Sequence, residues 1–490
     1  MIETLKNLTR HSTIYGLGAL LNRVLGFILL PIYTRYLTPS DYGILSLMTI
    51  TGAIVGVIAQ LSLGSAMFRE LIYEESDERT VESTTFYFLV GESVLFFGVL
   101  IAFSPQLSSL IFKIPDYADL LRLIFLTGLL NVLNVVVMAR LRIHEQSGLY
   151  STLSVGNFLV GATLNIYFIV VLQRGVEGVV MAGLISAILF ALLCLSLLFR
   201  DLRLVFSVSI LRRMLSYGIP MVPARLSNQV MTSADRYFLQ HLSTTTEVGL
   251  YSLGYSVGMV INLMVQAFQI AWRRQIFVIA KQPDAEQQFA KMLTYYLLVL
   301  GFMGLGLSVL GREVLVIMTT PKFYAAFKVV PLIILSYLFY GVRFITNTAL
   351  ETQNRMKYVP PIIIGSALLN MVLNYLLIPR YGMMGAAWAT VIAYVSLAFF
   401  QTAINQYFWH IPYEYKRIGK IVLVWGMIYG ASLLIQSPNT WLNGGLKLVL
   451  LVTYPFFLYL LRFYEKQELI AIKRLFQSRV YWIRNWSTGS

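Results

Sequence analysis

Long apolar stretches alternate with short polar segments along almost the whole chain. Fourteen of these stretches approach or exceed the roughly 20 residues that a helix needs to cross a bilayer. They lie near residues 12–34, 42–64, 84–105, 118–138, 150–172, 178–199, 213–237, 247–270, 290–311, 329–350, 358–379, 384–407, 418–436 and 443–462. Because a chain inside lipid has to satisfy its own backbone hydrogen bonds, each stretch is expected to be an α-helix. The pattern predicts an all-α polytopic membrane protein with about 14 transmembrane helices.

The charged residues indicate how the chain is oriented in the membrane. The net charge of +15 is typical of a nucleic-acid-binding protein, but 57% of the residues are hydrophobic and only 12% are charged. With the N-terminus inside, the inner loops and tails hold 25 lysines and arginines and the outer loops hold six. By the positive-inside rule, this bias predicts a multi-pass inner-membrane protein with both termini cytoplasmic and no nucleic-acid partner.

Residues suited to catalysis or metal binding are scarce. The single cysteine, Cys194, lies inside an apolar stretch, and the four histidines lie in loops or at helix ends. No glycine-rich phosphate loop followed by Lys and Ser or Thr is present. The first apolar stretch carries Arg23 in its middle and lacks a small-residue cleavage site, so it is not expected to be a signal peptide. We therefore expect no metal, no cofactor, no catalytic residues and no enzyme activity.

The second half of the chain repeats the first at an offset of 202–209 residues. The matching segments are Tyr15-Gly16 followed by Arg23 with Tyr217-Gly218 followed by Arg225, Asp41–Leu47 with Glu247–Leu253, Gly156 and Leu164-Asn165 with Gly365 and Leu373-Asn374, and Gly175–Ala182 with Gly382–Ala389. Each repeat has six predicted crossings, an even number, so the two are parallel repeats around an axis along the membrane normal. Such bundles around a central cavity are a common transporter plan, although a duplicated scaffold is the alternative.

This repeat predicts four domains. An N-terminal six-helix bundle covers 1–205 and a C-terminal six-helix bundle covers 206–410. Two further transmembrane helices occupy 411–463, and a basic amphipathic tail at 464–490 is expected to lie on the cytoplasmic leaflet.

Three arginines are predicted to lie deep in the membrane. Arg23 and Arg225 occupy equivalent repeat positions about 12 residues into their helices, and Arg343 is comparably deep. A central arginine costs about 2.5–3.5 kcal/mol on insertion scales, so it should face a wet cavity or a partner. Arginine suits phosphate because its planar fork donates two hydrogen bonds. The alternative is an ion pair with Glu92, Asp235 or Glu351.

The same helices carry other polar side chains. Glu92 and Asp235 are candidates either for an ion-coupling site or for ion pairs. Five amides have two possible roles, either binding sugar hydroxyls or forming hydrogen bonds between helices; they are Asn22, Asn228, Gln229, Gln266 and Gln269.

Three short motifs carry a resemblance to a known family. They are Leu37-Thr38-Pro39-Ser40-Asp41-Tyr42-Gly43, the segment Asp235-Arg236-Tyr237-Phe238-Leu239 with Val248-Gly249-Leu250-Tyr251, and Gly382–Ala387. In these the chain resembles the Wzx-type oligosaccharide flippases of the multidrug/oligosaccharidyl-lipid/polysaccharide exporter superfamily. The resemblance covers essentially the whole chain. It implies an undecaprenyl-diphosphate-linked oligosaccharide as substrate, for O-antigen or capsule assembly, a cationic cavity that suits Arg23 and Arg225, and possible polymerase and chain-length partner proteins.

Three other functions compete with a flippase. A cation-exporting multidrug transporter of the same superfamily would need deep acidic residues, whereas the deepest charges here are mainly arginines. A membrane-embedded glycan polymerase or ligase would need sizeable outer loops, and those predicted here are short. A scaffold protein is the third alternative.

Overall fold

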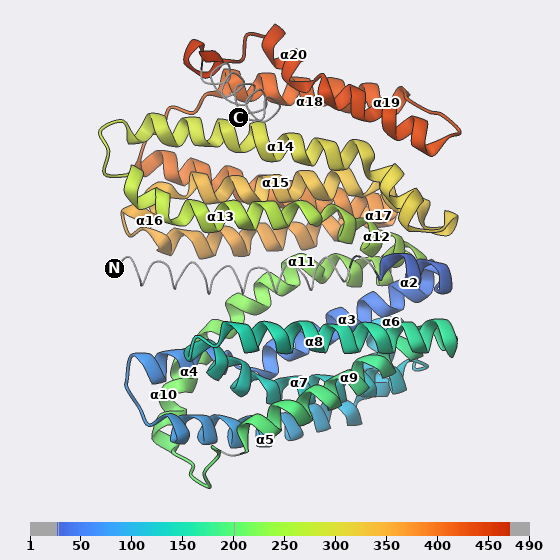
Figure 1. The fold of residues 1–490 in the computed structure, drawn as a ribbon, viewed down its shortest axis with the longest axis vertical. Helices are drawn as coiled ribbons and strands as arrows, with labels where there is room; N and C mark the ends of the chain where they lie inside the picture. Colours follow the sequence, from blue (N-terminus) through green and yellow to red (C-terminus); the bar gives the residue numbers. More distant parts are fainter. Residues whose placement is uncertain (1–26, 28, 200, 471–490) are drawn as a thin grey trace, which may run out of the picture. The chain divides into compact units, whose positions relative to one another are not determined.

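The computed structural model describes residues 27, 29–199 and 201–470, which hold α-helices and short helical turns but no β-strand. The helices of the first half are α2 (Leu30–Tyr36), α3 (Pro39–Ala59), α4 (Leu63–Ile72), α5 (Glu78–Ala102), α6 (Ser104–Phe112), α7 (Ala118–Ile143), α8 (Ser147–Ile166) and α9 (Gly175–Leu198). Those that follow are α10 (Val208–Gly218), α11 (Val222–Leu242), α12 (Thr245–Gly258), α13 (Val260–Ile279), α14 (Ala285–Met318), α15 (Val330–Thr346), α16 (Thr348–Thr352), α17 (Val359–Phe408), α18 (Tyr415–Leu434), α19 (Thr440–Val452) and α20 (Tyr454–Leu460) (Figure 1).

Ten helical runs in the described part of the chain are long and apolar enough to cross a membrane, or eleven when the bent pair Pro321–Lys328 and Val330–Thr346 counts as one span. The prediction of an all-α polytopic membrane protein is confirmed. The count of 14 stays a prediction, because the predicted crossing 12–34 lies largely outside the described residues. The predicted crossing 213–237 forms α10 and α11, but Arg225, Asp235 and Arg236 make α11 too polar to be among the ten.

The helix α17 is a hairpin rather than one straight rod. Its backbone leaves the helical conformation at Gly382, where φ is 53° and ψ is −133°. The hydroxyl of Ser396 donates to that of Ser366 over 3.4 Å. A continuous helix would hold residues 30 positions apart about 45 Å from each other, so the two halves must fold back on each other. The reversal lies where the sequence predicts a turn between 358–379 and 384–407.

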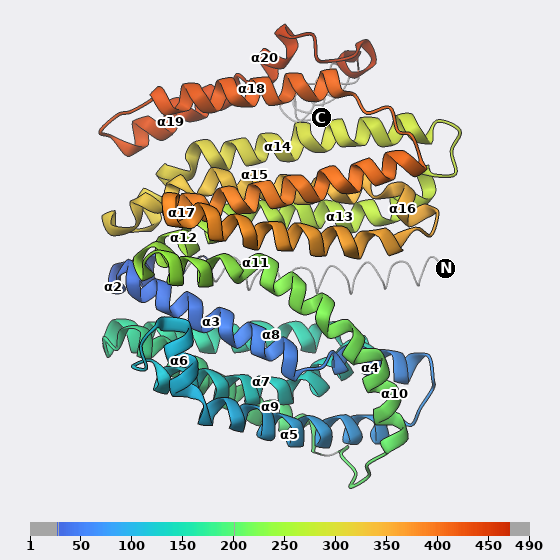
Figure 2. The same ribbon diagram turned by 180° about the vertical axis from the view of Figure 1, so that it is seen from behind.

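The described helices belong to two compact units. The first holds the described residues up to Gly254 together with Met318–Ala326 and Ala367–Ala389, and the second holds Tyr255–Ile317, Phe327–Ser366 and the chain from Thr390 on. Within the first unit, α7 packs against α3, α5 and α9. Within the second, α13 packs against α15, and α18 lies beside α14 (Figure 2). The four predicted domains follow the repeat along the sequence and stay a prediction.

Matching positions of the two repeats meet where α3 and α12 cross in the first unit. A side chain at Gly43 would collide with the carbonyl oxygen of Thr245, and one at Gly249 would collide with that of Pro39. Ser46 and Ser252 share a hydroxyl hydrogen bond of 2.8 Å. Each contacting residue of α3 has its counterpart 206 residues further along the chain, on α12. A local twofold axis therefore relates the two helices at the crossing, as in a symmetric dimer interface. Glycine allows the close backbone approach.

Equivalent side chains also start the two helices of this crossing. The Thr38 hydroxyl accepts from the backbone N–H of Asp41 over 3.2 Å, while an Asp41 carboxylate oxygen accepts from the Thr38 N–H over 2.9 Å. At the start of α12, the Thr244 hydroxyl accepts from the N–H of Glu247 over 3.2 Å. These caps satisfy the first free N–H groups of a helix.

Candidate functional site

The first unit contains a polar cavity of about 330 Å³, which we call the α7 cavity. Its walls come from the break between α3 and α4, from one face of α7 and from the start of α11. The lining residues are Gln60, Ser62, Gly64, Ser65, Asn131, Asn134, Val135, Met138, Arg142 and Arg225.

Two arginines give the α7 cavity its charge. Arg225 donates from Nη2 to the Ser65 hydroxyl over 2.8 Å. Arg142 donates from Nε to the carbonyl oxygen of Met138 over 3.2 Å, and its guanidinium lies 5.5 Å from the ring centre of Phe68. Neither arginine forms an ion pair with any residue that the structure describes. Most of their donors are therefore available to an anion.

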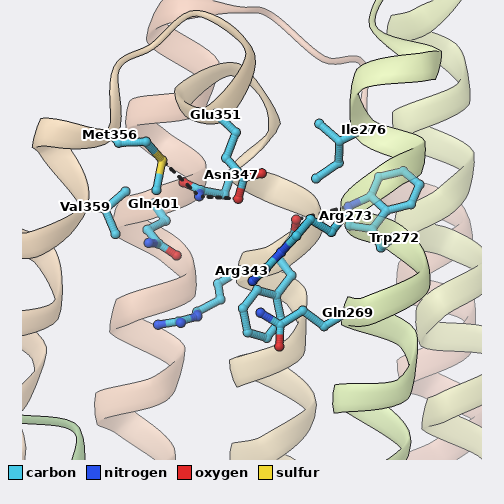
Figure 3. A pocket seen from close by; sticks show the side chains of 11 residues that line it. Gln269, Trp272, Arg273, Ile276, Arg343, Asn347, Glu351, Met356, Val359 and Gln401 are labelled. Atoms are coloured by element: carbon cyan, nitrogen blue, oxygen red, sulfur yellow. Dashed lines mark hydrogen bonds between the residues drawn. The ribbon is translucent and has the colours of Figure 1, made fainter. Parts of the chain in front are cut away.

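The second unit contains a smaller cavity of about 180 Å³, the α15 cavity, drawn in Figure 3. One wall is α13 and the others come from α15, α16 and α17 (Figure 3). The lining residues are Gln269, Trp272, Arg273, Ile276, Arg343, Phe344, Asn347, Glu351, Met356, Val359 and Gln401.

The α15 cavity also holds two arginines, Arg273 and Arg343, and neither forms an ion pair within the described chain. The Arg343 guanidinium lies 4.4 Å from the ring centre of Tyr340 and 4.8 Å from that of Phe344. Such cation–π contacts stabilise the charge without a carboxylate. The one acidic residue among the lining side chains, Glu351, accepts a hydrogen bond of 3.2 Å from Asn347.

The two cavities occupy equivalent positions in the two repeats. Three pairs of lining residues stand 205 positions apart: Gly64 with Gln269, Met138 with Arg343, and Arg142 with Asn347. Arg142 on α7 thus corresponds to Asn347, and Arg343 lies four residues, or about one helical turn, before that position. Residues four positions apart share a helix face, so both arginines point into the same kind of space.

The structure brings some of the predicted site residues into these cavities and places others elsewhere. Arg225 lines the α7 cavity, and Arg343 and Gln269 line the α15 cavity. Arg23 and Asn22 lie outside the described residues. Gln266 and Asn228 are not among the lining residues of either cavity.

Three other predicted residues have local partners. Gln229 donates to the Ser233 hydroxyl over 3.2 Å, and Glu92 accepts from the hydroxyl of its neighbour Ser93 over 3.4 Å. Asp235 is buried, pairs with the Arg236 guanidinium over 2.7 Å and accepts from the Tyr251 hydroxyl. Asp235 is therefore held in an ion pair with the next residue along the chain.

Several lining residues are not among those predicted from the sequence. Arg142 and Arg273 follow the predicted crossings 118–138 and 247–270 and thus fall in predicted inner loops, but α7 continues to Ile143 and α13 to Ile279. The signal in the sequence is the spacing of Asn131, Asn134, Met138 and Arg142, which recur every three or four residues and thus share one face of α7.

The fold is similar to those of solved polytopic helical membrane proteins. The lipid II flippase MurJ, in an inward closed conformation, aligns with a TM-score of 0.69 over 91% of this chain and 98% of its own, at 15% identity. An inward-facing multidrug resistance MATE family transporter of the MOP superfamily aligns with a TM-score of 0.58 over 79% of this chain and 94% of its own, at 16% identity. These two proteins are a flippase and a transporter rather than enzymes, in agreement with the prediction that the chain is not an enzyme.

Residues 32–271 match the model of a family described as polysaccharide biosynthesis protein. A protein of the Lsg locus of Haemophilus influenzae is 23% identical and aligns over 72% of this chain and 93% of its own length. The family resemblance seen in the sequence is thereby confirmed.

Proposed function

We propose that the chain is a flippase that moves a polyprenyl-diphosphate-linked oligosaccharide from the cytoplasmic to the outer leaflet by alternating access. The observation that carries this proposal is the pair of repeat-equivalent cavities, each with two arginines that lack a carboxylate partner among the described residues. A diphosphate is the anionic group common to such lipids. Arginine binds it through paired, charge-assisted hydrogen bonds and keeps its own charge at any physiological pH.

The family match and the flippase fold support the wider setting of this proposal. We also propose that the protein lies in the bacterial inner membrane with both termini cytoplasmic, which the positive-inside bias of its charges supports. The product would serve assembly of a cell-surface polysaccharide of the O-antigen or capsule type. Polymerase and chain-length proteins would then be its partners.

A direct test is lipid flipping in liposomes that contain the purified protein. A fluorescent undecaprenyl-diphosphate oligosaccharide is followed across the bilayer for wild type, Arg142→Ala, Arg225→Ala and Arg343→Ala. A hydrogen bond to a charged group contributes roughly 1.5–3 kcal/mol, so each loss should slow flipping by about 10- to 100-fold. The matched control is Arg122→Ala, because Arg122 lies on α7 in an exposed ion pair with Asp119.

If all three variants flip the lipid at the wild-type rate, the arginines do not take part in transport. A wild type that flips no lipid-linked glycan would remove the proposed function itself.

The similarity to MATE transporters favours one rival, the export of organic cations. Such a site needs carboxylates to bind its cargo, and Glu351 is the one acidic residue that lines either cavity. In the same liposomes, uptake of a cationic dye by wild type with no flipping of the lipid probe would favour this rival.

A further inference from the structure

The α7 cavity continues into a second space along the same two helices. This groove, the α3–α7 groove, has a volume of about 370 Å³. It is lined by Met48, Thr49, Gly52, Ala53, Gly56, Val57, Gln60, Ile124, Thr127, Gly128 and Asn131. Gln60 and Asn131 line both spaces, so the two amides mark the junction. Each space is within the roughly 300–1,000 Å³ that small-molecule sites occupy.

Near this junction the protein leaves buried polar groups without a partner. Asn134 lines the α7 cavity and is 5% exposed, yet neither its Nδ2 nor its Oδ1 has a hydrogen bond with any described residue. The Ser62 hydroxyl, which lines the same cavity, is 2% exposed and likewise has no partner in the described part of the chain. Buried polar groups are normally paired, and an amide offers both donors and acceptors. These groups therefore point to a polar, uncharged ligand.

The groove beyond the junction is open and carries no charge. A side chain added at Gly56 would meet no atom within 4 Å, so space lies directly against α3 there. The hydroxyls of Thr49 and Thr127 donate to carbonyl oxygens of their own helices, each over 2.8 Å, which leaves their oxygens able to accept. No acidic or basic side chain is among the lining residues of the groove.

We propose that the α3–α7 groove binds the first sugars of the lipid-linked glycan, with the diphosphate held at Arg142 and Arg225. This inference rests on the proposed function. In the substrate the first sugar is bonded to the diphosphate, so a sugar site has to adjoin the phosphate site, as the groove does. The amides at the junction match hydroxyl and acetamido groups, and the lack of charge selects neutral sugars. The prenyl chain, which offers no hydrogen bonds, would leave Asn134 and Ser62 unpaired.

The test compares lipids that differ only in their sugars. Binding to the full-length protein in nanodiscs is measured for undecaprenyl diphosphate and for the same lipid carrying one or four N-acetylhexosamine units. Gly56→Leu fills the groove and should weaken binding of the four-sugar lipid at least ten-fold. It should leave the sugar-free lipid unchanged. Asn134→Leu removes the amide and should weaken even the one-sugar lipid by about ten-fold.

The matched control is Gly98→Leu on α5, because Gly98 also has no neighbour within 4 Å and lies outside the groove. Equal losses for the sugar-free and four-sugar lipids would assign the groove to the prenyl chain and overturn the inference. Binding of the one-sugar and four-sugar lipids that is unchanged in Gly56→Leu and in Asn134→Leu would overturn the inference as well. A wild type that binds none of the three lipids would instead reject the proposed function.

Discussion

At the scale of single residues, Gly382 shows how one position reverses the direction of a helix. Its φ of 53° lies in the left-handed region, and an added side chain would collide with the Glu247 carboxylate. That carboxylate accepts from the N–H of Met383 over 2.8 Å and from the Ser243 hydroxyl over 2.8 Å. The turn predicted between 358–379 and 384–407 is therefore held by Glu247, which lies 136 residues before Met383 in the chain.

Gly382→Ala should destabilise the protein measurably. The substitution forces an L-residue into a conformation that costs about 1–3 kcal/mol and pushes Glu247 aside. We expect a lower midpoint of thermal unfolding for the purified protein in detergent. The control is Gly365→Ala on the same helix, because Gly365 has open space around it and replacing a helical glycine gains roughly 0.5–1 kcal/mol. Equal midpoints for both variants would contradict the strain argued for Gly382.

At the scale of helices, a buried ion pair fixes α19 against α14 in the second unit. Lys447 Nζ lies 2.6 Å from Glu313 Oε1, Asn443 Nδ2 donates to the same oxygen over 2.9 Å, and all three residues are buried. Around α18 and α20 the packing is apolar, through residues such as Val424 and Leu458. The ion pair therefore sets the register of α19 against α14, which apolar packing alone would not fix.

Lys447→Met should destabilise the packing of α19 on α14 by roughly 3–5 kcal/mol, because it leaves the Glu313 charge buried without its ion-pair partner. Adding Glu313→Leu to the same variant should recover most of that loss, since no buried charge is left. Thermal unfolding of both variants measures the difference. A double variant as unstable as Lys447→Met would show that the packing, and not the charge, is what the substitution damages.

A second ionic cluster holds the segment that follows α20. Glu468 accepts from Arg417 over 2.7 Å and from the Tyr295 hydroxyl over 2.6 Å. Burial opposes the charged form of Glu468, but these hydrogen bonds outweigh it, and the pKa of the carboxyl falls below its ordinary value of 4.5. Its contribution to stability is complete above the unfolded-state pKa and is lost as the pH falls through the lower folded-state pKa.

Glu468→Gln should therefore lower the unfolding midpoint at neutral pH, and the gap from wild type should close as the pH is brought well below 4.5. Unfolding midpoints of both proteins across the acidic range provide the measurement. A gap that is constant at every pH would mean that Glu468 stabilises by its shape and not by its charge.

Hydropathy predicts most of these helices because each apolar run has to become one, but it carries less information about polar helices and about packing. The helix α11 was predicted as a crossing, yet its arginine, amides and buried Asp235–Arg236 pair make it polar. The break at Leu61 and Ser62, both with positive φ, divides α3 from α4 and shapes the α7 cavity. No proline lies at this break, so the sequence does not predict it. The sequence predicts Arg343 from its depth, and Arg225 from its depth and its repeat position. Their cavity partners Arg142 and Arg273 depend on where helices end, which hydropathy locates poorly.

At the scale of the whole molecule, the self-matching crossing of α3 and α12 is one of the places where the two sequence repeats contact each other in the first unit, beside the packing of α10 and α11 on α4 and α3. Alternating access requires the repeats to change their mutual contacts. The symmetric contacts at this crossing are two close backbone approaches at glycines and one hydroxyl hydrogen bond, and none of them is an ion pair. We therefore expect this crossing to separate during the transport cycle.

The variant with Ser46→Cys, Ser252→Cys and Cys194→Ala tests this expectation. The two hydroxyl oxygens lie 2.8 Å apart, so a cysteine at each position would bring two sulfurs face to face across the crossing, and Cys194 is the one native cysteine. Oxidation should form the cross-link and stop lipid flipping in liposomes, and reduction should restore it. Each single-cysteine variant should flip lipid at the wild-type rate under both conditions. If the cross-linked protein flips lipid as fast as the reduced one, the crossing stays closed throughout the cycle and acts as a fixed pivot, and the motion that opens the cavities has to occur at other helices.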